Sequence, residues 1–366
     1  MVLKNYWWLL IWMFLFGAVS YLFIPRREEI VLGKACMRWG RLPAALLALP
    51  YVLWAAWRPD SFGDTGVYRT IFNEMPTGLN GLEEYVSSAT KGHGFVVIEY
   101  LFKTLLSQDS VLFFLFIALI QIVLLVKIYR KYSSDYWLSM FLFVASADYM
   151  SWVHNGMRQF LAVTIIFVSL PLLLKKRYVL MTLMVLLAAN IHSAALIFLP
   201  FIFVINGRAW NYRTILFILG LLLSILFLDK STGFIAKTME NTSYENEIDD
   251  FINDKGTNLV RVVFCSLPAF FTWLFRDRIN AKNDQLINLC TNLSIITAGM
   301  YVFSHFTSGI FVGAIPIFFS LANYILIPWL IQELFGGESA LVVKGTVMVV
   351  YGAFFYYQMG TTWGLL

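Results

Sequence analysis

Four polar side chains stand together where an apolar run of helix length begins. The stretch WVHNGMRQFLAV holds His154, Asn155, Arg158 and Gln159. A charge at membrane depth costs on the order of 2.5–3.5 kcal/mol on insertion scales, so an arginine here needs a reason. A guanidinium fork beside the free amides of a helix start suits a phosphate or diphosphate. The alternative is an arginine that snorkels to the membrane interface, neutralised by Asp148. The packed polar turn favours a site.

Two further residues are candidate proton acceptors. His192 lies in NIHSAALIFLP, and an imidazole titrating near working pH suits a general base or a partner for a substrate hydroxyl. For His192 alone, a histidine that caps a helix end is the simpler interpretation. Asp64 lies in GDTGVYR, where it could take a proton or orient a sugar. Its alternative is a turn, with Asp64 capping a helix from Thr65. Tyr68 and Arg69 beside it are candidate substrate-binding residues, together with His154, Asn155 and Gln159.

The remaining polar groups carry weaker signals. Glu99 and Lys103 are spaced i, i+4, which favours a plain salt bridge on one helix. His93, between Gly92 and Gly94, is typical of a mobile loop. The three cysteines show no disulfide or metal-ligand spacing, and there is no Gly-x-Ser-x-Gly elbow. We therefore expect no metal and no cofactor, with either a metal-free reaction or none.

The composition is that of a membrane protein. Of 366 residues, 59% are hydrophobic and 13% charged, against about 25% charged in soluble domains. The apolar runs are 15 to 25 residues long, which suits helices crossing a hydrocarbon core of about 30 Å. We expect an all-α polytopic protein, a single integral membrane domain over residues 1–366 with about twelve transmembrane helices. The expected segments are 6–24, 42–57, 110–127, 136–150, 158–174, 178–190, 193–205, 213–228, 259–275, 285–303, 310–331 and 341–358.

Residues 178–205 decide the orientation. As one helix they would rise about 42 Å, too long for one upright span, so we expect two short helices turning at residues 190–193. With that turn, most lysines and arginines between the segments fall on one side of the membrane. Two long segments then face outward. Residues 58–109 are expected to hold an interfacial helix on which Phe95, Ile98 and Phe102 share an apolar face, and residues 229–258 form an acidic loop.

Three landmarks occur in order along the chain: DTGVYRTIFN, NGMRQFLAV and NIHSAALIFLP. Together they resemble the EpsG/Wzy family of bacterial polysaccharide polymerases over roughly residues 60–205, and KGHGFVVIEYLFKTL between them also looks like the family. Such proteins often carry another basic residue in a late helix. Here FVGAIPIFFSLANYILIPWL has Gly313 and Ala314 in that region, so one expected charge is absent.

The resemblance implies a GT-C-like glycosyltransferase architecture in the bacterial cytoplasmic membrane, with an active site facing outside. The donor would be a growing glycan on undecaprenyl diphosphate, and the acceptor a hydroxyl of a lipid-linked repeat unit, with inversion at the sugar. Arg158 would stabilise the departing diphosphate and Asp64 or His192 would take the proton. Tyr68, Asn155 and Gln159 would position the sugars. The implied partners are lipid-linked oligosaccharides and membrane lipids, with a chain-length regulator left open and no nucleic acid.

Two other functions stay open. A ligase that moves a finished glycan to a different acceptor would use the same lipid carrier, and acceptor identity is not visible in the sequence. A non-enzymatic flippase of lipid-linked glycans would need charges in mid-helix and on both faces, and this chain has few. An inert scaffold would leave the HNGMRQ turn without a reason.

Overall fold

The structure is a computed structural model that describes residues 6–23, 27–146, 148–227, 237 and 254–365. The chain divides into two compact units that interleave along the sequence. Unit 1 comprises Met1–Val168, Leu186–Ala195 and Ile327–Leu366, and unit 2 comprises Ser169–Val185 and Leu196–Leu326. Every candidate site residue named from the sequence belongs to unit 1.

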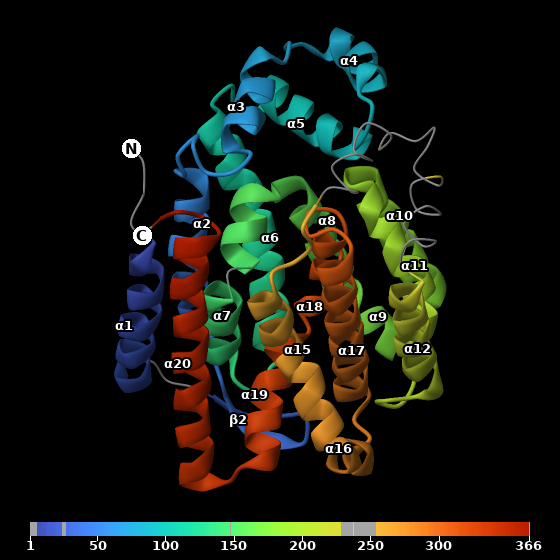
Figure 1. Cartoon of the computed structure of the whole chain (residues 1–366). Coiled ribbons are helices and arrows are strands. Elements are labelled where there is room, and N and C mark those ends of the chain that lie inside the picture. Colours follow the sequence, from blue (N-terminus) through green and yellow to red (C-terminus); the bar gives the residue numbers. More distant parts are fainter. Residues whose placement is uncertain (1–5, 24–26, 147, 228–236, 238–253, 366) are drawn as a thin grey trace. The chain divides into compact units, whose positions relative to one another are not determined.

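Helix is present in each of the twelve segments expected from the apolar runs. The elements are α1 (Trp7–Phe23), α2 (Arg41–Ala56), α6 (Ser110–Tyr132), α7 (Tyr136–Ala145), α8 (Met157–Ser169), α9 (Pro171–Leu174), α10 (Tyr178–Ile191), α11 (Phe198–Val204), α12 (Tyr212–Leu226), α15 (Leu259–Leu274), α16 (Arg276–Lys282), α17 (Gln285–Phe306), α18 (Ile317–Ser320), α19 (Asn323–Leu334) and α20 (Gly337–Thr361). The chain is mostly helical, as predicted (Figure 1).

Fewer helices than twelve are long enough to cross a membrane unaided. Among the described residues, four helices meet the length and composition of a span, or six if each of two bent helix pairs is one span. The other apolar helices are 10–17 residues long. The protein is therefore polytopic by composition, and twelve crossings stay a prediction.

A β-hairpin near the N-terminus departs from the all-α prediction. β1 (Arg27–Val31) pairs antiparallel with β2 (Lys34–Arg38). The two turn residues, Leu32 and Gly33, both have positive φ, at 54° and 73°. This is the signature of a type I′ turn, whose twist matches that of paired strands. The turn was not predicted from the sequence, because its first position holds a leucine rather than the usual Asn, Asp or Gly.

The chain turns back within residues 178–205, as predicted. α10 ends at Ile191, a 3₁₀ turn covers Ser193–Ile197, and α11 follows. In unit 2, Asn206 Nδ2 donates to Tyr178 Oη at 2.7 Å, so the end of α11 lies beside the start of α10. At 14 residues, α10 rises only about 21 Å, less than a full bilayer core.

The segment expected as one helix over residues 310–331 is broken. A 3₁₀ turn at Val312–Ala314 precedes α18, and α19 departs from that first part at 54°. Pro316 is the N-cap residue of α18, where its fixed φ suits a helix start and where it supplies no amide to a preceding turn. Apolar length alone does not report such a break.

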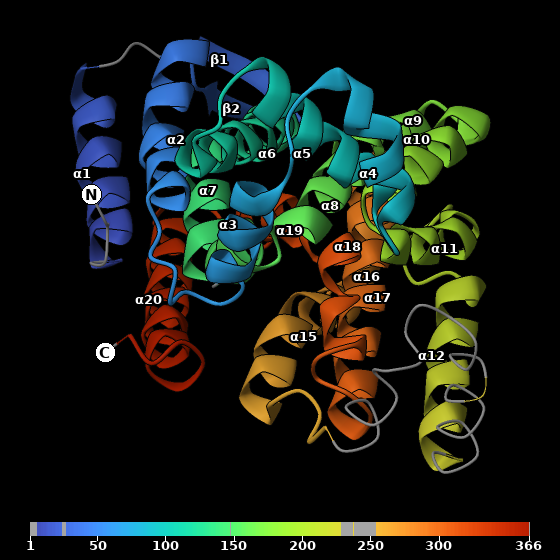
Figure 2. The ribbon, with the colours of Figure 1, turned by 90° about the horizontal axis from the view of Figure 1, so that it is seen from above.

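The segment 58–109, predicted to face outward, forms three α-helices at one end of unit 1: α3 (Thr65–Glu74), α4 (Leu82–Ser88) and α5 (His93–Leu105), seen from two directions in Figures 1 and 2. Arg69 Nη1 donates to Ser110 Oγ, which ties α3 to the start of α6. The apolar face predicted on α5 is covered by protein, since Phe95 and Phe102 both pack on Phe113.

The opposite end of unit 1 is basic. Arg38 of β2 donates to the Lys131 carbonyl, and Arg130 Nε donates to the Trp39 carbonyl, so the hairpin lies at the far end of α6. Because α6 has 23 residues, the two ends are separated by about 34 Å. Of the acidic segment 229–258, all but residues 237 and 254–258 lies outside the described residues.

Candidate functional site

A π-helical turn positions the polar cluster that opens α8. The turn covers Tyr149–Asn155 and closes with Gly156 N donating to the Ser151 carbonyl at 3.0 Å. π-Turns are rare, and they are frequent at functional sites. Gln121, buried on α6, donates to the Met157 carbonyl at 2.8 Å. That contact places the start of α8 about 16 Å along α6 from Ser110, so the cluster is recessed beneath α3–α5.

Arg158 is half-buried and is not fully engaged by the protein. Its Nε is buried without a hydrogen-bond partner in the described part of the chain. Gly92 lies directly against it, because a Cβ added there would be 3.0 Å from Arg158 Nη1 and 3.0 Å from the Ile191 carbonyl. Gly92 also has a φ of +72°, which favours glycine.

The Gly92–Gly94 stretch is a packed helix start rather than a mobile loop. His93 is the first residue of α5, and a Cβ on Gly94 would lie 2.9 Å from the Asn190 carbonyl. The start of α5 is therefore pressed against the end of α10 by two residues without side chains. The expectation of a loop at His93 was wrong because sequence spacing does not report this close approach.

Glu99 and Lys103 do not form the salt bridge that their spacing predicts. Lys103 Nζ donates instead to the carbonyls at the end of α3, those of Phe72, Asn73 and Met75, at 2.7, 2.8 and 2.5 Å. Three carbonyls at a helix C-terminus hold an ammonium well, because they carry the negative end of the helix dipole. Glu99 is left 3% exposed, with Oε1 unpartnered among the described residues.

The charge of Arg158 on α8 acts on Glu99. Burial raises the pKa of Glu99 to about 7, and the charge of Arg158, followed by that of Lys103, opposes this rise. Across the described residues no ion pair joins Glu99 to Arg158, so their charged atoms stay more than 4.0 Å apart. The two groups thus influence each other without a direct ion pair.

The charge of Arg158 also acts on His192. Burial, then the positive charges of Arg158 and Lys91, lower the pKa of His192 to about 4. Its Nδ1 is buried and finds no partner in the described chain. A neutral imidazole at pH 7 can donate or accept one hydrogen bond to a substrate hydroxyl, but its affinity for a proton is low.

Tyr68 completes the cluster from α3. Burial raises the pKa of Tyr68, while the charge of Arg158 lowers it, as does a hydrogen bond from the Arg158 backbone. The charge of Arg158 on α8 thus acts on three groups of unit 1, namely Tyr68 on α3, Glu99 on α5 and His192 just after α10; with Arg158 they form the Arg158 cluster. Three of them were predicted site residues, and Glu99 was not.

Asp64 and Asn155 are joined as part of the scaffold. The Asp64 amide donates to Asn155 Oδ1 at 2.7 Å, and a Cβ on Gly63, whose φ is +50°, would lie 1.9 Å from the same oxygen. The Asp64 carboxylate is exposed. It occupies the N-cap position of α3 without making a capping bond.

His154 and Arg69 lie apart from the cluster. His154 is 0% exposed among the rings of Tyr6, Phe62 and Tyr149, and neither ring nitrogen has a hydrogen-bond partner among the described residues. Arg69 Nε pairs with Asp60 Oδ1 at 2.5 Å, and its Nη1 is held by Ser110. Gln159 is half-buried, one position beyond Arg158.

A family model, described as the EpsG family, matches residues 42–362. The chain belongs to the EpsG family. The match covers nearly the whole chain and includes every residue of the Arg158 cluster. Membership supports a role for this EpsG protein as a membrane-associated polysaccharide polymerase, an enzyme of the glycosyltransferase type. No curated protein and no solved structure matches the chain.

Arg58 is a further cation of the EpsG chain that the sequence analysis did not select. It is 1% exposed, donates to Thr65 Oγ1 at 3.0 Å and to the Ala55 carbonyl at 2.6 Å, and lies over the Phe114 ring. Burial lowers the pKa of Arg58 to about 10, so it stays charged at pH 7. Its place just after an apolar helix is shared by ordinary interfacial arginines, which is why no sequence signal singled it out.

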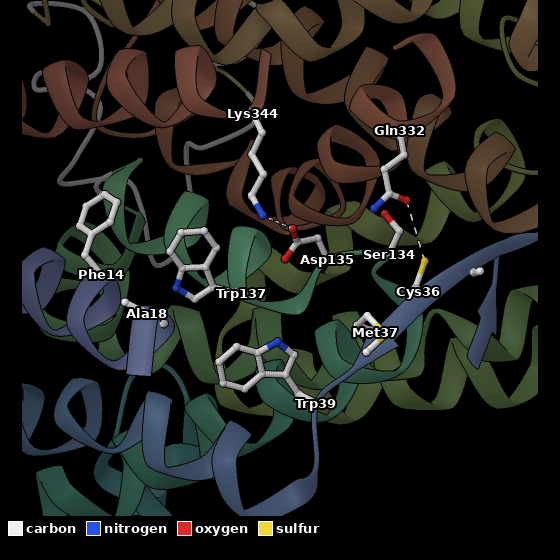
Figure 3. A pocket seen from close by; sticks show the side chains of 12 residues that line it. Phe14, Ala18, Cys36, Met37, Trp39, Ser134, Asp135, Trp137, Gln332 and Lys344 are labelled. Carbon is white, nitrogen blue, oxygen red and sulfur yellow. Dashed lines mark hydrogen bonds and ion pairs between the residues drawn. The ribbon is translucent and has the colours of Figure 1, made fainter. Parts of the chain in front are cut away.

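A separate cavity of about 520 Å³ lies at the basic end of unit 1, shown in Figure 3. Its walls include Trp39 and Trp137, and Lys344 forms an ion pair with Asp135 at its edge. Both charges there are satisfied by each other, and the cavity is at the end of α6 opposite to α3–α5. The polar cluster around Arg158 is therefore the better candidate for glycosyl-transfer chemistry.

Proposed function

We propose that this EpsG-family chain transfers a growing glycan from polyprenyl diphosphate to a lipid-linked repeat unit. One observation carries the proposal. Arg158 is half-buried at the start of a helix, with its Nε unpaired among the described residues and with Tyr68, Glu99 and His192 around it. A guanidinium held in this way by a polar cluster suits a phosphate-bearing ligand better than a snorkelling role does.

In the proposed reaction, the group that most needs stabilisation is the departing diphosphate. When the bond between the anomeric carbon and the diphosphate breaks, negative charge develops on the diphosphate oxygens. A guanidinium that is already in place and partly shielded from water stabilises that charge better than one in bulk water does. Arg58 adds a second buried positive charge to the region, which supports the proposal even though Gly313 and Ala314 stand where a second basic residue is expected.

The outer face of the cytoplasmic membrane is the proposed side of reaction. The basic hairpin and the basic end of α6 lie about 34 Å from the α3–α5 end of unit 1, and lysine and arginine are enriched in cytoplasmic loops. By that rule the Arg158 cluster opens outward, where lipid-linked repeat units are polymerised.

The remaining residues take supporting roles in the proposal. Tyr68, His192 and Gln159 position sugar hydroxyls, and Asp64, whose side chain is exposed, contacts the incoming substrate. Asn155 holds the Asp64 segment in place through its amide oxygen. His154 and Arg69 were both expected to touch substrate and are assigned structural roles. Asp60 and Ser110 already hold the Arg69 guanidinium, and His154 is 0% exposed among aromatic rings, which leaves it no surface for a substrate.

Reconstitution tests the proposal. The purified chain in proteoliposomes is given polyprenyl-diphosphate-linked repeat units, and the products are separated by size. Wild type is expected to produce a ladder of repeats, whereas Arg158→Ala leaves single units unextended. Arg276→Ala, which removes an exposed arginine of unit 2, is the matched control and should extend chains normally. Full-length polymer from the Arg158→Ala variant would exclude the diphosphate role, and transfer only to a foreign acceptor would indicate a ligase.

A further inference from the structure

Glu99 has the features of a reacting group without a structural task. Its side chain is 3% exposed, and Oε1 makes no hydrogen bond within the described chain. Buried carboxylates in proteins are nearly always paired, because removing a charge from water is costly. Lys103, the natural partner one turn away, is turned to the carbonyls at the end of α3. A buried carboxylate with one oxygen unpartnered in the described chain, and under the influence of an arginine charge, calls for a functional reason.

The position of Glu99 in the fold agrees with a functional role. α5 meets Arg158 at Gly92, and Glu99 lies seven residues further on the same face of the helix. The charge of Arg158 acts on Glu99, yet no ion pair forms between them in the described residues. In a single displacement, the incoming hydroxyl and the departing diphosphate occupy opposite faces of the anomeric carbon. A base and a cation for that reaction must be close but separated.

We infer that Glu99 is the general base that takes the proton of the acceptor hydroxyl, in the reaction proposed above. The acceptor oxygen forms a bond to the anomeric carbon of the donor sugar, and its proton passes to the Glu99 carboxylate. The bond from the anomeric carbon to the diphosphate oxygen breaks, and its electron pair leaves on the diphosphate beside Arg158. Glu99 then returns the proton to water.

The other two candidate bases fit this task less well. Burial and the charges of Arg158 and Lys91 oppose an imidazolium at His192, so it is a weak acceptor of a full proton. The Asp64 side chain is exposed to solvent, and its backbone is tied to Asn155. Glu99 has a pKa of about 7, where a general base combines a large ionised fraction with useful basicity. The titratable groups around it are Arg158, Lys103 and Tyr85, with Glu74 beyond Tyr85.

Three variants of the full chain in the reconstituted assay test the inference. Glu99→Gln should lower kcat by roughly 100-fold or more, the usual contribution of a general base, with KM for the lipid-linked acceptor changed by less than about threefold. Wild-type kcat should fall as the pH drops through about 7, and the residual activity of the Gln variant should lack that acid limb. Glu99→Asp, which keeps a carboxylate, should restore part of kcat, and Glu84→Gln on α4 should match wild type.

The outcomes distinguish a failure of the role inferred for Glu99 from a failure of the proposed polymerase function. A fully active Glu99→Gln variant beside an active wild type overturns the role of Glu99 and leaves the polymerase function standing. Loss of kcat with an unaltered pH profile assigns Glu99 to structure and also overturns the inference. A wild-type chain that makes no polymer from any lipid-linked repeat unit overturns the proposed function, and the base with it. Size-exclusion profiles of all variants verify that each one is folded.

Discussion

Replacing Glu99 by Gln should stabilise the protein more as the pH rises. Folding moves this carboxyl from water to a site 3% exposed with Oε1 unpartnered in the described chain, and burial raises its pKa from 4.5 to about 7. A carboxyl with that shift costs the fold about 3 kcal/mol at pH 7 and about 1 kcal/mol at pH 5. Glutamine has nearly the same shape and no charge, so this cost disappears.

The direction of the pH dependence follows from the raised pKa. The folded state holds the proton more tightly than the unfolded state. Wild-type stability from this group is therefore complete below pH 4.5 and is lost as the pH rises to about 7. The glutamine variant lacks this loss. Between pH 5 and pH 8 the free-energy difference between variant and wild type should widen by about 2.5 kcal/mol. For a cooperative unit of the size of unit 1, this free-energy difference corresponds to about 5–10 °C in apparent Tm.

Thermal unfolding in detergent at several pH values measures this difference. Glu84→Gln on α4, where the carboxylate is exposed, is the matched control and should show no widening with pH. A constant offset between Glu99→Gln and wild type from pH 5 to pH 8 would refute the reasoning, because packing or an unsatisfied amide would then explain the effect. A wild type that gains on the variant with rising pH would show a stabilising ion pair instead.

Four further outcomes are expected. Lys103→Met should lower the free energy of unfolding by about 2–4 kcal/mol, seen as a lower Tm, because three carbonyls, two of them in buried contacts, lose a charged donor; an unchanged Tm would contradict this. Gly63→Ala should destabilise by about 1–3 kcal/mol more than Gly33→Ala, since both have positive φ but only the first would meet a side chain, and equal losses of Tm would argue against that contact. His192→Gln should raise KM several-fold while keeping the acid limb of the kcat profile, and loss of that limb would make His192 the base. A cysteine at Asp64, in a chain without its three native cysteines, should react with a membrane-impermeant reagent from outside only; labelling from inside would reverse the proposed orientation.

The sequence by itself determined which segments are helical and where the polar cluster begins. Apolar length predicted helix in all twelve segments, and the return within 178–205 followed from a run too long for one span. Arg158 was selected because a charge at the start of an apolar helix costs free energy whatever the tertiary structure around it. These properties are local, so spacing and composition suffice to find them.

Only the tertiary structure decided which polar groups remain unpaired. From the sequence, Glu99 and Lys103 were predicted to form a salt bridge on one helix, and His154 was predicted to bind substrate. In the fold, the end of α3 takes the lysine, and aromatic rings that include Tyr6 and Phe62 surround the histidine. The partner of a charge is chosen among groups far apart in sequence, since burial removes the water that would otherwise satisfy it. The spacing of residues along one helix therefore cannot predict which partner a buried charge will have.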